Sequence, residues 1–160
     1  MDARIRRFGG LEGREPTGRS RHRGSLCNPR TRGRSVILDT NALSAWADGH
    51  PACRPAFAEA RRVVIPVIVL GEYQYGIRQS RHRTRYEEWL AGNIPLVEVR
   101  PVSPATASHY ADLRLHLKST GTPIPANDLW IAAMVKELRL PLLSNDAHFD
   151  LVPGLDRIAF

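Results

Sequence analysis

Residues 35–44, SVILDTNALS, place an aspartate directly after a short apolar run. The run Val36-Ile37-Leu38 is typical of a buried β-strand, and Asp39 follows where the chain would leave the strand for a helix. An unpaired carboxylate beside a buried strand costs several kcal/mol to desolvate. Asp39 therefore needs a partner, and two readings stay open: it caps the following helix, or it binds a ligand.

Short apolar runs alternate with segments of helical length along the rest of the chain. After 36–38, strand-like runs occur at 63–65, 96–99, 141–143 and, more weakly, 157–160. Helices are expected at 41–60 with a break at Pro51, and at 67–80, 83–93, 104–120 and 127–140. This alternation predicts an α/β fold over residues 35–160, a three-layer α/β/α domain whose central parallel sheet has four to five short strands.

The net charge of +7 is concentrated in the first part of the chain. Residues 1–34 contain ten arginines against three acidic residues, whereas residues 35–160 contain thirteen basic and thirteen acidic residues. With almost no apolar content, residues 1–34 are expected to be a disordered basic tail, or an extension ahead of the true start. A non-enzymatic basic RNA-binding module stays an alternative function, but the net positive charge that supports it lies entirely in residues 1–34.

The chain is expected to be a cytoplasmic protein with no membrane segment. Its longest apolar run, at 63–70, is far shorter than the roughly 20 residues that span a bilayer, and Pro66 interrupts it. The pair Arg6-Arg7 is not followed by the apolar stretch of an export signal.

Four acidic residues follow predicted strands or stand in the first turns of predicted helices, at positions expected to share one edge of the sheet. In parallel α/β sheets, ligands bind at this edge, beyond the carboxyl ends of the strands. The four are Asp39, Glu72, Asp128 and Asp146. Each has an ordinary structural reading on its own, as a helix cap, a first-turn acid or a turn residue. Glu72 fits such readings least, because it interrupts an otherwise apolar helix.

Carboxylates gathered at one edge repel one another unless one is protonated or a cation neutralises them. Their oxygen ligands suit a hard ion, Mg²⁺ or Mn²⁺, rather than zinc. Such an ion activates a water as nucleophile and polarises a phosphoryl oxygen. The pattern therefore predicts metal-assisted hydrolysis of a phosphodiester.

Four motifs, in their order and spacing, resemble the PIN-domain ribonucleases, specifically the VapC-like toxins of toxin–antitoxin pairs. They are LDTNALS (38–44), GEYQYGI (71–77), NDLWIAA (127–133) and SNDAHFDLVPGL (144–155). The resemblance covers residues 35–160 and implies that the catalytic, metal-binding acids are Asp39, Glu72, Asp128 and Asp146. Asn41 matches a polar position that helps to hold the first aspartate, and Ser144 stands where the family often has threonine.

The resemblance implies a Mg²⁺- or Mn²⁺-dependent endoribonuclease that cleaves cellular RNA and is the toxin of a toxin–antitoxin pair. It also implies a homodimer and a cognate antitoxin that lies in a groove among the early helices. Haloacid-dehalogenase-like phosphotransferases are an alternative enzyme class, since they also place an aspartate after the first strand. They need a second acid two residues later, where this chain has Asn41.

One basic cluster stands out in the sequence of residues 35–160, formed by Arg78, Arg81, Arg83 and Arg85 together with His82. The ordinary explanation is a solvated helix end. The alternative is that this arginine cluster contacts RNA phosphates, which an acidic centre would otherwise repel. Such contacts would position the RNA without reading its sequence.

Overall fold

Within residues 33–160, which the computed structural model describes, five parallel strands form one sheet in the order β3-β2-β1-β4-β5. The strands are β1 (Ser35–Leu38), β2 (Arg62–Pro66), β3 (Glu98–Arg100), β4 (Leu142–Leu143) and β5 (Arg157–Ile158). The central strand β1 pairs with β2 on one side and with β4 on the other. Residues 36–38 of β1 are completely buried, as the apolar run predicts.

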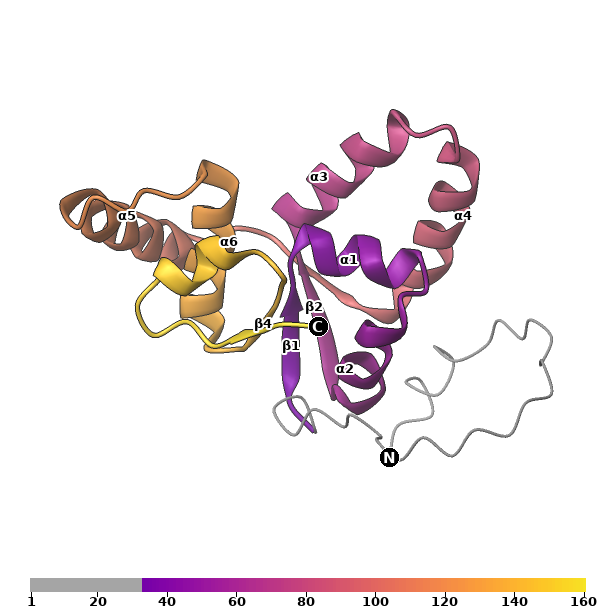
Figure 1. Ribbon diagram of the computed structural model, residues 1–160, viewed down its shortest axis with the longest axis horizontal. Helices are drawn as coiled ribbons and strands as arrows, with labels where there is room; N and C mark the ends of the chain where they lie inside the picture. Colours follow the sequence, from indigo (N-terminus) through magenta and orange to yellow (C-terminus); the bar gives the residue numbers. More distant parts are fainter. Residues whose placement is uncertain (1–32) are drawn as a thin grey trace.

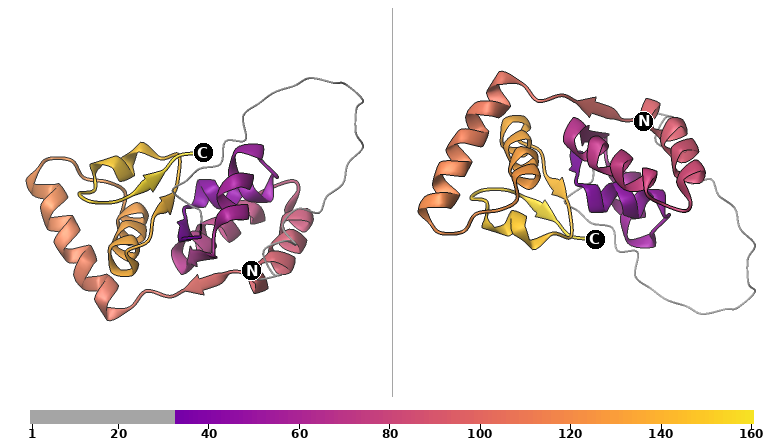
Figure 2. Two further views of the ribbon diagram at one scale, coloured as in Figure 1. Left: turned by 90° about the horizontal axis from the view of Figure 1, so that it is seen from below. Right: turned by 90° about the horizontal axis from the view of Figure 1, so that it is seen from above.

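Helices cover both sides of the strands. They are α1 (Thr40–Ala47), α2 (Arg54–Glu59), α3 (Val67–Arg78), α4 (Arg83–Asn93), α5 (Pro104–Ser119) and α6 (Ala126–Leu138). Short 3₁₀ turns are η2 (Pro51–Cys53), η3 (Ile94–Leu96) and η4 (Ala147–Leu151). Figures 1 and 2 show α1 to α4 gathered on one side and α5 and α6 on the other. The predicted α/β/α architecture with a parallel sheet is confirmed.

The local sequence explains where several helices begin and end. The chain turns directly from β1 into α1, where the Asp39 side chain accepts a hydrogen bond from the backbone N–H of Thr40. Ser103 and Thr106 form a capping box at the start of α5. Helix α6 ends at Leu138, and the residue that follows, Arg139, adopts a left-handed conformation with φ 52°. Helix α1 therefore begins directly at the carboxyl end of β1.

One predicted strand is partly wrong. The apolar run at 96–99 was expected to be extended from its first residue, but Leu96 belongs to η3 and β3 begins only at Glu98. Pro95 is the reason, because its fixed φ suits the first residues of a helical turn. The backbone N–H of Val97 accordingly bonds to the carbonyl of Ile94.

The predicted basic tail lies outside the described residues, except for Gly33 and Arg34. Within the described part, the backbone N–H of Gly33 donates to the carbonyl of Glu59 at 2.8 Å, which fixes the entry into β1. No helix in residues 33–160 has the length and apolar character needed to cross a membrane.

A carboxylate joins α5 to α6. Glu137 of α6 accepts hydrogen bonds from the hydroxyls of Ser103, at 2.8 Å, and Thr106, at the start of α5. The bond from Thr106 is the main reason that the pKa of Glu137 lies below its ordinary value. A lowered carboxyl pKa means that this contact stabilises the fold at neutral pH and is lost as the pH falls and Glu137 is protonated.

We predict that Glu137→Gln lowers the free energy of unfolding by about 1 to 2 kcal/mol at pH 7, because charged hydrogen bonds to two hydroxyls are weakened. The difference from the parent should be smaller at about pH 3, because the stabilisation is lost as the pH falls from the ordinary glutamate pKa of about 4.3 through the lowered pKa of Glu137. Urea denaturation of both proteins at the two pH values measures this. The exposed Glu88→Gln is the matched control, and equal stability of Glu137→Gln and the parent at pH 7 would contradict the prediction.

Candidate metal centre

Asp39 lies at the end of β1 with only 5% of its surface exposed. One carboxylate oxygen accepts from the backbone N–H of Thr40 at 2.6 Å. The other accepts from the side-chain amide of Asn41 at 2.6 Å and from the hydroxyl of Ser144 at 2.7 Å. The predicted capping role of Asp39 is therefore real, but it uses only one of the two oxygens.

The charge environment of Asp39 contains two further acids. Burial raises its pKa, and the hydrogen bonds from Ser144 and Thr40 oppose that rise. The carboxylates of Asp146 and Glu72 raise the pKa further. Asp39 is thus close enough to both to be affected by their charge, as the prediction of a shared edge requires.

Ser144 connects the first aspartate to the fourth. It is completely buried, and its hydroxyl donates to Asp39 while accepting from the backbone N–H of Asp146 at 2.9 Å. Asn41 adds a second link, since its carbonyl oxygen accepts from the backbone N–H of Asn145 at 3.1 Å. The loop after β4 is therefore tied to the start of α1. Asn41 and Ser144 both donate to Asp39, and their supporting role in a metal site stays a prediction.

Glu72 reaches the same edge from the middle of α3. One of its oxygens accepts from the Thr40 hydroxyl and the other from the side-chain amide of Asn127, both at 2.5 Å. Thr40 follows Asp39 in the chain, and Asn127 precedes Asp128. Glu72 thus has the partners that a half-buried carboxylate requires, and it joins α1, α3 and α6 at the site.

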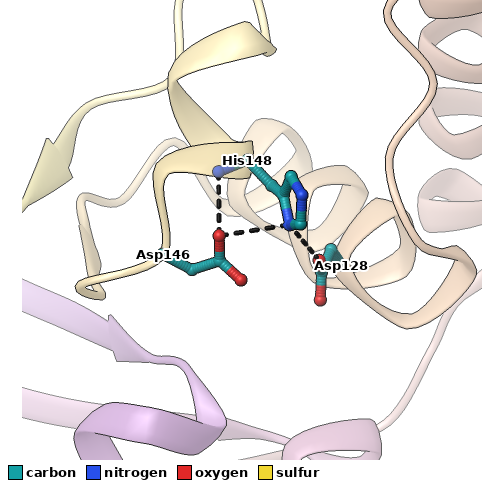
Figure 3. Close-up of side chains that lie close together, drawn as sticks. All are labelled: Asp128, Asp146 and His148. Atoms are coloured by element: carbon teal, nitrogen blue, oxygen red, sulfur yellow. Dashed lines mark hydrogen bonds and ion pairs between the residues drawn. The ribbon is translucent and has the colours of Figure 1, made fainter.

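Asp128 and Asp146 face each other across the ring of His148 (Figure 3). The His148 Nδ1 lies 3.1 Å from Oδ1 of Asp146 and 3.5 Å from Oδ2 of Asp128. The backbone N–H of His148 also donates to Asp146 at 2.8 Å. One ligand atom from each of the three residues lies within 4.8 Å of the other two.

The pKa of Asp128 is raised to about 6. Burial is the largest cause, followed by the charges of Asp146 and Asp39, and Glu72 adds a smaller contribution; His148 acts in the opposite direction. Within residues 33–160, no lysine or arginine forms an ion pair with any of the four acids. This edge therefore carries an excess of negative charge, and its carboxylate oxygens fit a divalent cation.

The structure adds three residues that the sequence prediction did not include. Thr40 and Asn127 orient Glu72, and each is the immediate neighbour of a predicted acid. His148 stands two residues after Asp146, so the expectation of purely oxygen ligands overlooked a nitrogen in the same motif. Asp150, another acid of the same motif, does not join the four acids and instead forms a two-point ion pair with Arg157, at 2.7 and 2.6 Å.

The arginine cluster lies around the turn from α3 to α4. Arg78 is in the last turn of α3, and Arg83 and Arg85 are in the first turn of α4. All four arginines, including Arg81, are exposed. Arg83 pairs with Glu87 at 2.8 Å, and Arg81 donates to His82 at 3.1 Å. Contact with RNA stays a prediction for this cluster.

Residues 36–155 match the family model of the PIN domain. The chain therefore belongs to the PIN-domain family, and the predicted family resemblance is confirmed. This also removes the support for the haloacid-dehalogenase-like alternative, whose second acid is replaced by Asn41, a donor to Asp39.

Within this family, the chain is similar to proteins named VapC. It is 29% identical over 120 residues to ribonuclease VapC5 of Mycobacterium tuberculosis, covering 74% of this chain and 87% of that protein. It is 28% identical over 124 residues to ribonuclease VapC2 of Rickettsia felis, covering 74% and 92%. A crystal structure of VapBC2 from Rickettsia felis bound to a promoter DNA fragment matches with a TM-score of 0.71 and 26% identity, covering 79% of this chain and 98% of that one.

In the metal-free protein, Asp128 should make stability depend on pH. Its folded pKa of about 6 lies above its unfolded value of about 3.9, so ionisation destabilises the fold progressively as the pH rises from about 4 to 6. We predict that Asp128→Asn is more stable than the parent by about 1 to 2 kcal/mol at pH 7.5, allowing for solvent screening and for a smaller loss at the helix dipole. The gain should vanish at pH 4. Denaturation in EDTA tests this, and a less stable variant at pH 7.5 would favour a purely structural role for Asp128.

Proposed function

We propose that this protein is a divalent-metal-dependent endoribonuclease and the toxin of a toxin–antitoxin pair. The observation that carries the proposal is the convergence of Asp39, Glu72, Asp128 and Asp146 at one edge of a PIN domain. The relatives named ribonuclease VapC support the choice of RNA as substrate.

The four acids are assigned as the catalytic, metal-binding residues, with Mg²⁺ or Mn²⁺ as the ion. When bound, such an ion activates a water and stabilises charge on the scissile phosphate. Asp128 and Asp146 have 17% and 36% of their side chains exposed, whereas Asp39 has 5% of its surface exposed. Hydroxyl and amide donors fix the carboxylate oxygens of Asp39 and Glu72.

Asn41 and Ser144 are assigned positioning roles. Both donate to the same oxygen of Asp39, and Ser144 also holds the backbone of Asp146. Their contribution is preorganisation, because the carboxylates stand together before any ion binds. Such fixed groups need no rearrangement when charge develops on the substrate.

The proposal includes a protein partner. The similarity to VapBC-5 of Mycobacterium tuberculosis, a member of the VapBC family of toxin–antitoxin systems, supports a cognate antitoxin that restrains this chain. We also propose a homodimer and a cytoplasmic location, as the family resemblance implies.

The proposed activity predicts that the full-length protein cleaves single-stranded RNA with Mg²⁺ or Mn²⁺ and not in EDTA. Asp128→Asn should lose cleavage, because it removes one charge from the ion-binding edge, while the exposed His116→Ala should keep it. Metal at about 100 times its dissociation constant should stabilise the parent by roughly 2.7 kcal/mol. Gel assays of RNA and melting curves give the two readouts. Equal cleavage by Asp128→Asn, or cleavage by the parent in EDTA, would overturn the proposal.

The arginine cluster gives a separate prediction about RNA binding. Arg78→Ala with Arg81→Ala, in the non-cleaving Asp128→Asn background, should weaken binding equally for different RNA sequences. Two lost phosphate contacts should reduce the slope of log affinity against log salt by about 1.4. Arg139→Ala, at the end of α6, is the control. An unchanged salt slope would show that the arginine cluster is only a solvated helix end.

A further inference from the structure

The ring of His148 stands between two of the proposed metal ligands. Its Nδ1 faces both carboxylates, at 3.1 Å from Asp146 and 3.5 Å from Asp128 (Figure 3). The three ligand atoms lie within 4.8 Å of one another. Ligands on opposite sides of one ion stand about 4 to 4.5 Å apart, because metal–oxygen and metal–nitrogen bonds are about 2.0 to 2.3 Å long. The three atoms therefore already form a group of nearly the right size.

The ring is not needed to hold Asp146 in place. The backbone N–H of His148 already donates to the same oxygen of Asp146 at 2.8 Å. The Asp146 backbone is held separately by Ser144. Half of the His148 side chain is exposed, so the ring is also not part of the apolar core. The orientation of the ring is therefore set by the charge of the two carboxylates, which a bound cation would also satisfy, and not by packing of the fold.

The loop that carries His148 is braced on both sides. Phe149, the next residue, is 1% exposed and anchors η4 in the core. Arg157 of β5 donates to the carbonyl of Ser144 at 3.0 Å and forms the ion pair with Asp150. These contacts restrain the chain before and after the ring. His148 is therefore presented to the site by a fixed segment.

We propose that Nδ1 of His148 is a ligand of the same ion as Asp128 and Asp146, and that this nitrogen makes the site prefer Mn²⁺ to Mg²⁺. Mg²⁺ selects oxygen ligands, whereas imidazole binds transition-metal ions more readily. The inference rests on the proposed function, which requires a divalent ion at this site. It adds a ligand that discriminates between Mg²⁺ and Mn²⁺, so that the ligand set contains one nitrogen beside the carboxylate oxygens.

The direct test is electron spin echo envelope modulation of the full-length protein, stripped with chelator and loaded with less than one equivalent of MnCl₂. An imidazole nitrogen bound to Mn²⁺ produces ¹⁴N modulation, which ¹⁵N-histidine labelling changes. The parent and the control His116→Ala should show it, and His148→Ala should not. The backbone contact to Asp146 survives the substitution, so His148→Ala is expected to fold. Modulation that is absent from the parent, or unchanged in His148→Ala, overturns the proposal.

Affinity measurements give an independent readout. His148→Ala should weaken Mn²⁺ binding by at least about tenfold, the lower end of what even a supporting group contributes to a metal site. Mg²⁺ binding should change much less. Equal losses for both ions would overturn the proposed selectivity. A parent that binds Mn²⁺ and cleaves RNA without ¹⁴N modulation refutes only this inference, whereas a parent that binds neither ion refutes the proposed function as well.

Discussion

Asp39 has a carboxylate with 5% exposure at the end of a completely buried strand, and three donors hold it there. A buried charge is tolerated only when hydrogen bonds replace the lost water, because its desolvation would otherwise exceed what packing returns. Here the donors come from the first turn of α1 and from Ser144 after β4. The partners that the Asp39 carboxylate requires are therefore donor groups that follow two neighbouring parallel strands, β1 and β4.

The hydroxyl of Ser144 extends this constraint to the rest of the site. It donates to Asp39 and accepts from the backbone of Asp146, so the first and fourth acids share one anchor. Thr40 makes a similar connection, because its backbone N–H binds Asp39 and its hydroxyl binds Glu72. The carboxylates consequently stay together despite their repulsion. Burial first, and the charges of Asp146 and Asp39 second, raise the pKa of Asp128 to about 6. Ionised Asp128 therefore lowers the free energy of unfolding at neutral pH, and the same charge is available to bind a cation.

The sequence predicted the parallel α/β architecture and the edge at which the acids meet, since both follow from local patterns. Asp39 was recognisable because it directly follows an apolar strand. The contacts of Glu72 were not, because Thr40 and Asn127 are 32 and 55 residues away in the chain and only the packing of α1, α3 and α6 brings them together. The sequence showed that His148 lies two residues after Asp146. It did not show that the ring faces the two carboxylates, because that orientation depends on the turn η4. The strand expected at 96–99 begins only at Glu98, because Pro95 places Leu96 in the helical turn η3.

Cleavage of RNA by this acidic edge can be measured in cells by sequencing RNA 5′ ends after brief induction of the protein. New 5′ ends are expected at defined positions with the parent protein, and none of them with Asp128→Asn produced to the same level. Identical 5′ ends with both proteins, or none with the parent, would contradict it.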